Sequence, residues 1–101
     1  MRIVGSRSHL NDETKSFIEA IKTEKIIEVV SSGSSLKFCL VAEGEADQYP
    51  RFAPTMEWDT AAGQAICEAA GVSVIDHTSN APLLYNKEDL LNPWFLVSNN
   101  L

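Results

Sequence analysis

The chain has 101 residues, of which 45% are hydrophobic and 22% charged, and its formal net charge is −6. These values are typical of a single globular domain, and no stretch approaches the roughly 20 apolar residues that cross a bilayer, so we expect no transmembrane segment. The negative charge argues against a nucleic-acid polymer as partner, because a surface that follows a phosphate backbone needs an excess of Lys and Arg. A small phosphorylated ligand needs only a local basic pocket, so the negative net charge does not argue against such a ligand.

The first part of the chain alternates between strand and helix signals. Residues 3–4 begin a short strand, a polar turn follows, and the Asn-Asp-Glu run at 11–13 supplies the cap and acidic first turn of a helix. Residues 25–30 are rich in β-branched side chains and predict a second strand. The Ser/Gly run 31–35 is expected to end that strand before another helix.

The second part continues this alternation. Residues 46–52 predict a strand that Pro54 ends, and a helix is expected to begin near Asp59. Gly71 is well placed to end this helix. A set of small or apolar side chains shares one face at helical spacing and predicts close packing there: Ala61, Ala62, Ala65, Ile66, Ala69 and Ala70.

Two more strands are expected at residues 72–75 and 95–97, with a turn at 77–82 after the first of them. Strands that alternate with helices predict an α/β fold in which helices and a mixed sheet form layers, here as one domain over residues 1–101. Cys39 and Cys67 stand among apolar neighbours without metal-site spacing, which is typical of buried thiols in a cytoplasmic protein.

Polar residues concentrate where predicted strands give way to helices. Ser34, Ser35 and Lys37 stand at a helix start, where free backbone N–H groups, the helix dipole and an ammonium together favour a phosphate. The spacing of a P-loop is missing. Taken alone, these residues are better explained as a serine cap on a helix whose lysine faces solvent.

Arg7, His9, Arg51 and Asp59 also have ordinary explanations when each is taken alone. The turn that contains Arg7 and His9 could grip an anion, yet polar turns with a capping serine are common. Arg51 could clamp a phosphate through its planar guanidinium, but a single arginine at a strand end is usually solvated. Asp59 could bind Mg²⁺, although aspartate is also a favoured helix cap.

Read together and in order, these motifs resemble the C-terminal half of the Mg²⁺-dependent inositol-monophosphatase-like phosphatases. The Trp-Asp-Thr-Ala-Ala-Gly block at 58–63 is typical of that superfamily. Ser-Arg-Ser-His at 6–9, Gly-Ser-Ser-Leu-Lys at 33–37 and Tyr-Pro-Arg-Phe at 49–52 favour its CysQ-type branch, the 3′(2′),5′-bisphosphate nucleotidases. Ala-Ala-Gly at 69–71 and Leu-Asn-Pro at 91–93 extend the resemblance over almost the whole chain.

The resemblance implies roles for individual residues and a reaction. Asp59 is implied to be one carboxylate ligand of a catalytic Mg²⁺, and the implied reaction converts adenosine 3′,5′-bisphosphate and water to AMP and phosphate, usually in sulfur metabolism. The implied fold is the C-terminal subdomain of an αβαβα sandwich. The residues implied to contact the nucleotide or its phosphates are His9, Ser34, Lys37 and Arg51, with Arg7 and Ser35 beside them.

One part of the family pattern is missing. The other metal ligands and the water-activating residues belong to an N-terminal half with the motif Asp-Pro-(Ile/Leu)-Asp-Gly-Thr, and this chain contains no Asp-Pro, Asp-Gly or Gly-Thr pair. We therefore expect a substrate-binding C-terminal subdomain with no catalytic residue of its own, inactive when isolated. The N-terminal half is its expected partner, and without it an exposed apolar surface would favour self-association.

Two alternatives stay open at this stage. The chain could belong to an inositol or sugar monophosphatase, or it could be a non-catalytic ligand-binding or assembly domain. The expected location is the cytoplasm, including a peripheral position at the inner membrane.

Overall fold

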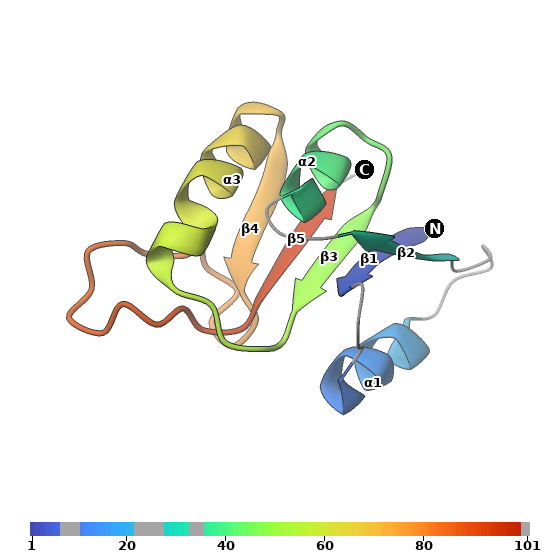
Figure 1. The fold of residues 1–101 in the computed structure, drawn as a ribbon, viewed down its shortest axis with the longest axis horizontal. Helices are drawn as coiled ribbons and strands as arrows, with labels where there is room; N and C mark the ends of the chain where they lie inside the picture. The colour runs from blue at the N-terminus through green and yellow to red at the C-terminus, as the bar shows by residue number, and fades with distance from the viewer. Residues whose placement is uncertain (7–10, 22–27, 33–35, 100–101) are drawn as a thin grey trace.

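The computed structural model describes residues 1–6, 11–21, 28–32 and 36–99. Strands and helices follow one another in the order that the sequence predicts (Figure 1). The elements are β1 (Arg2–Ser6), α1 (Asp12–Ala20), β2 (Glu28–Ser32), α2 (Leu36–Ala42), β3 (Gln48–Arg51), α3 (Glu57–Ala69), β4 (Val72–Asp76) and β5 (Phe95–Asn99).

The strands form one five-stranded mixed sheet in the order β2-β1-β3-β5-β4. β1 runs parallel to both β2 and β3, whereas β5 lies antiparallel between β3 and β4. The first four strands in the sequence therefore point the same way, and their carboxyl ends lie at one edge of the sheet. Open α/β sheets commonly bind ligands at such an edge.

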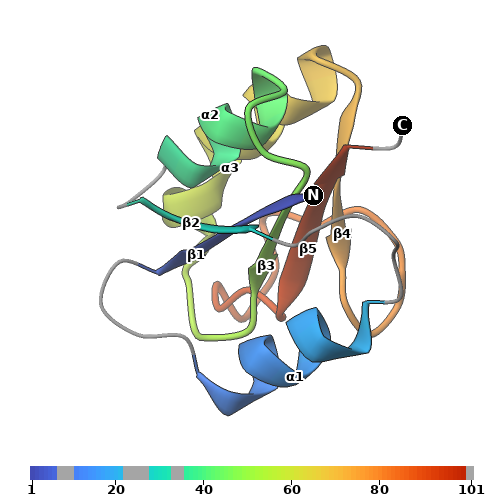
Figure 2. The same ribbon diagram turned by 90° about the vertical axis from the view of Figure 1, so that its right-hand side faces the viewer.

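Helices cover the sheet on both faces, which makes three layers. Figure 2 shows α2 and α3 on one face and α1 on the other. One hydrophobic core cluster lies between the sheet and the layer formed by α2 and α3. Its buried residues are Val4, Phe38, Val41, Ala46, Tyr49, Cys67, Val72, Val74, Leu83, Phe95 and Val97. Full burial of a Val or Phe side chain contributes about 1.5–3 kcal/mol, so this cluster holds the layers together.

Several local predictions are confirmed. The Asn11 side chain caps α1 by accepting a hydrogen bond from the Thr14 N–H at 2.9 Å. Gly71 follows α3 with a φ of +80°, a left-handed conformation that suits glycine at the end of a helix. Cys39 and Cys67 are free thiols, and Cys67 is fully buried as predicted, whereas Cys39 is only half-buried.

Other predictions were wrong. β2 runs through Ser31 and Ser32, which the Ser/Gly signal placed in a break, because both residues pair with the end of β1. By contrast, α3 begins at Glu57, two residues before Asp59, which confirms the helix start predicted near that residue.

The alanine face of α3, predicted to pack closely, is exposed instead. Gly63 and Cys67 face the core together with polar side chains that find hydrogen-bond partners there. No helix in the described part of the chain is long and apolar enough to cross a membrane.

Candidate anion pocket

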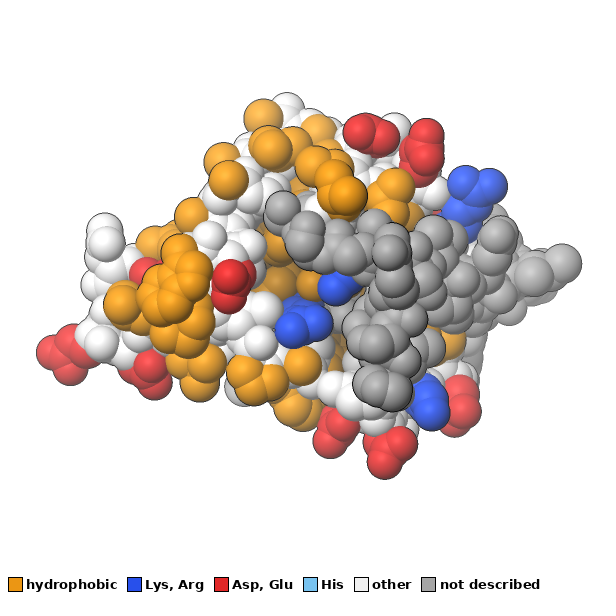
Figure 3. All heavy atoms as spheres, in the orientation of Figure 1, with side chains coloured by type: hydrophobic (Ala, Val, Ile, Leu, Met, Phe, Trp, Pro, Cys, Tyr) orange, Lys and Arg blue, Asp and Glu red, His pale blue; other side chains and the backbone are white. Residues whose placement is uncertain are grey.

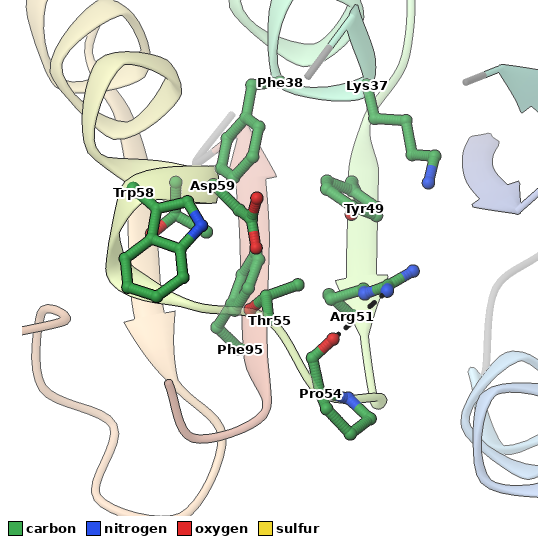
Figure 4. Close-up of a pocket in the computed structure, with 10 residues that line it drawn as sticks. Lys37, Phe38, Tyr49, Arg51, Pro54, Thr55, Trp58, Asp59 and Phe95 are labelled. Atoms are coloured by element: carbon green, nitrogen blue, oxygen red, sulfur yellow. Dashed lines mark hydrogen bonds between the residues drawn. The ribbon is translucent and has the colours of Figure 1, made fainter. Parts of the chain in front are cut away.

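A pocket of about 490 Å³ opens where β3 ends and where α2 and α3 begin. Figure 4 shows Trp58 and Asp59 of α3 on one side and Lys37 and Arg51 on the other. Three predicted site residues, Lys37, Arg51 and Asp59, thus line one pocket although 22 positions separate the first from the last. The remaining lining residues are Phe38, Tyr49, Pro54, Thr55, Thr60 and Phe95.

The ordinary explanation of Lys37 required its side chain to face solvent, and the structure shows that it does not. The residue is only 6% exposed, and its ammonium lies 5.4 Å from the centre of the Tyr49 ring. Burial first, and the charge of Arg51 second, lower the pKa of Lys37. Burial raises the pKa of Tyr49, so the ring beneath the ammonium stays a neutral phenol. A buried cation beside a second cation is a favourable site for an anion.

Arg51 is the second cation of this pocket, and its hydrogen bonding is incomplete. Nη2 donates to the Pro54 carbonyl at 3.4 Å, while the buried Nε has no hydrogen-bond partner. Within the described residues no carboxylate lies at ion-pair distance from Lys37 or Arg51. A buried donor without a partner costs about 1–3 kcal/mol, and an anion bound in the pocket would offset part of the cost of holding two cations there.

Asp59 lies in the first turn of α3 and has a structural role. One carboxylate oxygen accepts a hydrogen bond from the Met56 N–H at 2.9 Å, which caps the helix. The residue is exposed, and its side chain points into the pocket in Figure 4. Asp59 is thus not the N-cap residue itself, which is Met56, but it supports the N-terminus of α3 from the first turn and keeps its second oxygen available to a ligand.

The segment before β5 fixes the position of the α3 N-terminus. Asn92 is 4% exposed, and the two hydrogens of its Nδ2 are shared among three acceptors, Thr55 Oγ1 at 3.2 Å, the Met56 carbonyl at 3.0 Å and Thr60 Oγ1 at 3.0 Å. The Tyr85 hydroxyl lies 3.1 Å from the same Thr60 oxygen. These bonds hold the turn that carries Asp59, which explains why a Leu-Asn-Pro block accompanies the Trp-Asp block in this sequence.

A charged contact holds the same segment to the first turn of α3. Glu57 accepts a hydrogen bond from the Asn86 N–H at 2.8 Å and forms an ion pair with Lys87. The hydrogen bond from Lys87 is the main cause that lowers the pKa of Glu57. Lys87 is thereby occupied and is not a second phosphate ligand.

The other predicted contacts, Arg7, His9, Ser34 and Ser35, lie outside the described residues. Tyr49 is a pocket residue that the sequence reading missed. Its signal was present, since residues two apart on a strand share one face of the sheet, and Tyr49 precedes Arg51 by two.

Mg²⁺ binding requires more oxygen ligands than this pocket supplies. Asp59 offers one carboxylate, and no three His, Cys, Asp or Glu side chains group around a common metal position among residues 1–6, 11–21, 28–32 and 36–99. Mg²⁺ usually takes one or two carboxylates and completes its six ligands with water and phosphate. Asp59 fits as one such ligand, and the remaining protein ligands would have to come from other residues.

Comparison with protein families gives a match over residues 2–100 to the inositol monophosphatase family. The chain belongs to this family. The 3′(2′),5′-bisphosphate nucleotidase CysQ of Escherichia coli K12 is 50% identical over 97 residues, which are 95% of this chain and 38% of that protein. An uncharacterized protein of Rhizobium leguminosarum is 52% identical over 77 residues, 70% of this chain and 80% of its own length.

Solved structures agree with this family membership. CysQ from Bacteroides thetaiotaomicron superposes with a TM-score of 0.91 at 59% identity, over 99% of this chain and 37% of that one. The staphylococcal inositol monophosphatase IMPase-II has a TM-score of 0.70 at 20% identity, over 98% and 36% of the two chains, which shows a shared fold. The α/β fold and its place within an inositol-monophosphatase-like structure are thus confirmed, and the chain spans little more than a third of these proteins.

Proposed function

We propose that this chain is the anion-binding part of a 3′(2′),5′-bisphosphate nucleotidase that needs Mg²⁺ and a second part of the protein for activity. The observation that carries the proposal is the pair Lys37 and Arg51, two cations in one pocket without a carboxylate partner among the described residues. The likeness to CysQ proteins at 50% and 59% identity supports the choice of substrate.

The geometry suits a substrate with two phosphates. Asp59 faces Lys37 and Arg51 across the pocket, so a phosphate near Asp59 and a phosphate near the two cations would occupy different ends (Figure 4). The Arg51 guanidinium would donate to the second phosphate, and Lys37 would neutralise that phosphate from the Tyr49 side. A substrate with only one phosphate would leave one end without its ligand.

Asp59 would hold one face of a Mg²⁺ ion through the oxygen that does not cap α3. When bound, the metal supplies a water of lowered pKa and neutralises charge on the scissile phosphate. The chain's own residues position the substrate: Arg51 and Lys37 bind one phosphate, and Thr55 and Trp58 line the remaining wall. No described residue of the pocket is placed to activate the water, so turnover requires the second part.

The exposed face of α3 is the proposed contact with that second part. Ile66 is 50% exposed, and the neighbouring α2 exposes Leu36 to 60%. In Figure 3 apolar side chains gather over both helices on the face that also holds the basic pocket. Small side chains on α3 permit a close approach of another backbone, and those of this face are Ala61, Ala62, Ala65 and Ala69.

A chimera tests the whole proposal. The part of the Escherichia coli relative that precedes the matched region is joined to this chain, and phosphate release from adenosine 3′,5′-bisphosphate is measured with Mg²⁺. We expect turnover by the chimera, none by the 101-residue chain, and loss of turnover in the chimera with Asp59→Asn. Robust turnover by the isolated chain would show that the second part is not required.

Arg51→Ala in the same chimera identifies the phosphate contact. Loss of one charge-assisted hydrogen bond of about 1.5–3 kcal/mol should raise KM for the bisphosphate about 10- to 100-fold. Lys15→Ala, which removes an exposed cation from α1, is the matched control and should change KM little. Equal effects of the two variants would contradict the assigned role of Arg51.

The same assay decides between the remaining candidates. Faster turnover of inositol monophosphate, unaffected by Arg51→Ala, would assign an inositol monophosphatase, as in the staphylococcal structure with that ligand bound. A well-folded chimera that binds the bisphosphate but hydrolyses neither substrate would favour a non-catalytic ligand-binding domain.

A further inference from the structure

A second groove lies on the α1 face of the sheet, opposite the α2 and α3 layer that borders the anion pocket. Its volume is about 520 Å³, within the range of small-molecule sites. It forms at the same sheet edge, between the first half of α1, the end of β4 and the residues that flank β3 and β5 (Figure 2). The lining residues are Asp12, Glu13, Ser16, Phe17, Phe52, His77 and Trp94.

Four rings form a continuous aromatic wall in this groove. Phe52 is 3% exposed and contacts Trp94 in a stacked arrangement at 5.5 Å, His77 at 4.4 Å and Phe17 edge-on at 5.3 Å between ring centres. Trp94 remains 39% exposed. The buried Phe52 ring therefore holds the Trp94 indole in place, and the exposed part of the indole is open to a ligand.

The rim of the groove is acidic. Asp12 and Glu13 are exposed in the first turn of α1, and no described residue engages either carboxylate through a hydrogen bond or an ion pair. No Lys or Arg is among the described residues that line the groove. A ring face attracts a cation through its quadrupole, and carboxylates nearby strengthen that attraction.

We propose that this groove binds an organic cation, an ammonium group with an apolar body, whose charge lies between the Trp94 and Phe17 rings and the Asp12 and Glu13 carboxylates. The two faces of the sheet thus select ligands of opposite charge. The acidic rim repels phosphates, and the net charge of −6 disfavours a second copy of this chain as the occupant.

The test compares choline with 3,3-dimethylbutan-1-ol, a neutral alcohol of the same shape. Binding to the full chain is followed by amide chemical shifts in NMR, and by Trp94 emission in a Trp58→Phe background that leaves Trp94 as the one remaining tryptophan of the two in the sequence. We expect choline to bind at least about 10-fold more tightly than the alcohol and to shift residues 12–17, 52, 77 and 94.

Charge variants identify the rim. Asp12→Asn with Glu13→Gln should weaken choline binding about fivefold or more, whereas Glu43→Gln with Glu45→Gln, an equal charge change at exposed positions outside the groove, should not. Phe17→Leu, which keeps apolar bulk, should also weaken it. Equal binding of choline and the alcohol to the wild-type chain would overturn the proposal. So would the absence of measurable choline binding, or chemical-shift changes confined to the anion pocket. Among the variants, equal effects of the two double substitutions would overturn it.

Discussion

Gly63→Ala provides a sharp test of how α2 and α3 pack. A Cβ at position 63 would lie 2.6 Å from Cγ and 2.7 Å from Cδ2 of the Phe38 ring, far inside contact distance. The ring cannot retreat, because Phe38 is 3% exposed, stacks on Phe95 at 5.7 Å and meets Tyr49 edge-on at 5.5 Å.

Two opposing effects determine how much Gly63→Ala changes the free energy of unfolding. Alanine in the helix interior gains about 1 kcal/mol over glycine, and overpacking costs about 1–3 kcal/mol. Since Phe38 is enclosed by two other rings, we expect the upper half of that cost and a net loss of about 1–2 kcal/mol in the free energy of unfolding. For a domain of this size the Tm should fall by roughly 4–16 °C.

Urea unfolding of the 101-residue chain measures this effect. Ala62→Gly, at the neighbouring exposed position, is the matched control and reports the helix-propensity change alone, about 1 kcal/mol of destabilisation. In a Phe38→Leu background the clash is relieved, so Gly63→Ala should become neutral or stabilising. A rise in stability for Gly63→Ala in the wild-type background would refute the reasoning.

Three further predictions concern stability and reactivity. Asn92→Ala removes both N–H donors of the amide, which three acceptors share, and should lower the free energy of unfolding by about 2 kcal/mol in urea; wild-type stability would contradict the anchoring role. Because the pKa of Glu57 is lowered in the folded chain, the advantage of wild type over Glu57→Gln should be full above the model-peptide value of 4.5 and vanish as the pH falls below it, and a constant difference across that range would disprove the Lys87 contact. Burial raises the pKa of Cys67 from 9.0 to about 11, so iodoacetamide at pH 8 should label Cys39 well before Cys67, as mass spectrometry can check. For the same reason, the free energy of unfolding should fall between pH 9 and 11 more in wild type than in Cys67→Ala.

The order of elements could be predicted because several helix boundaries carry a local signal. Asn11 at a helix start and Gly71 at a helix end act through their own backbone neighbours, so a short stretch of sequence contains all the information. The end of β2 could not be predicted in this way. Ser31 and Ser32 have weak strand preference, and only their pairing with β1 keeps them in the sheet.

The orientation of α3 was missed for a physical reason. Alanine packs well on a buried face and is tolerated on an exposed one, so its spacing does not decide which side faces the core. The buried side includes Thr60 and Gln64, whose polar atoms bond to Tyr85 from a distant segment. Sequence reading cannot anticipate such partners.

The pocket also has features that the sequence predicts and features that depend on tertiary contacts. Lys37, Arg51 and Asp59 were found through motifs, but the burial of Lys37 over the Tyr49 ring depends on α2 packing against β3. That packing is a tertiary contact and has no local signature.

The position of β5 has a consequence for how this chain folds as it is made. β5 is the last strand among the described residues, yet it lies inside the sheet between β3 and β4, and it is the one described strand that β4 pairs with. Until residues 95–99 have left the ribosome, β3 lacks its antiparallel neighbour, and β4 has only its bridge to Pro82 and no neighbouring strand. Completion of the sheet therefore waits until β5 has been made, and a ribosome-nascent chain truncated before Phe95 should expose unpaired strand edges and be sensitive to protease and prone to aggregation.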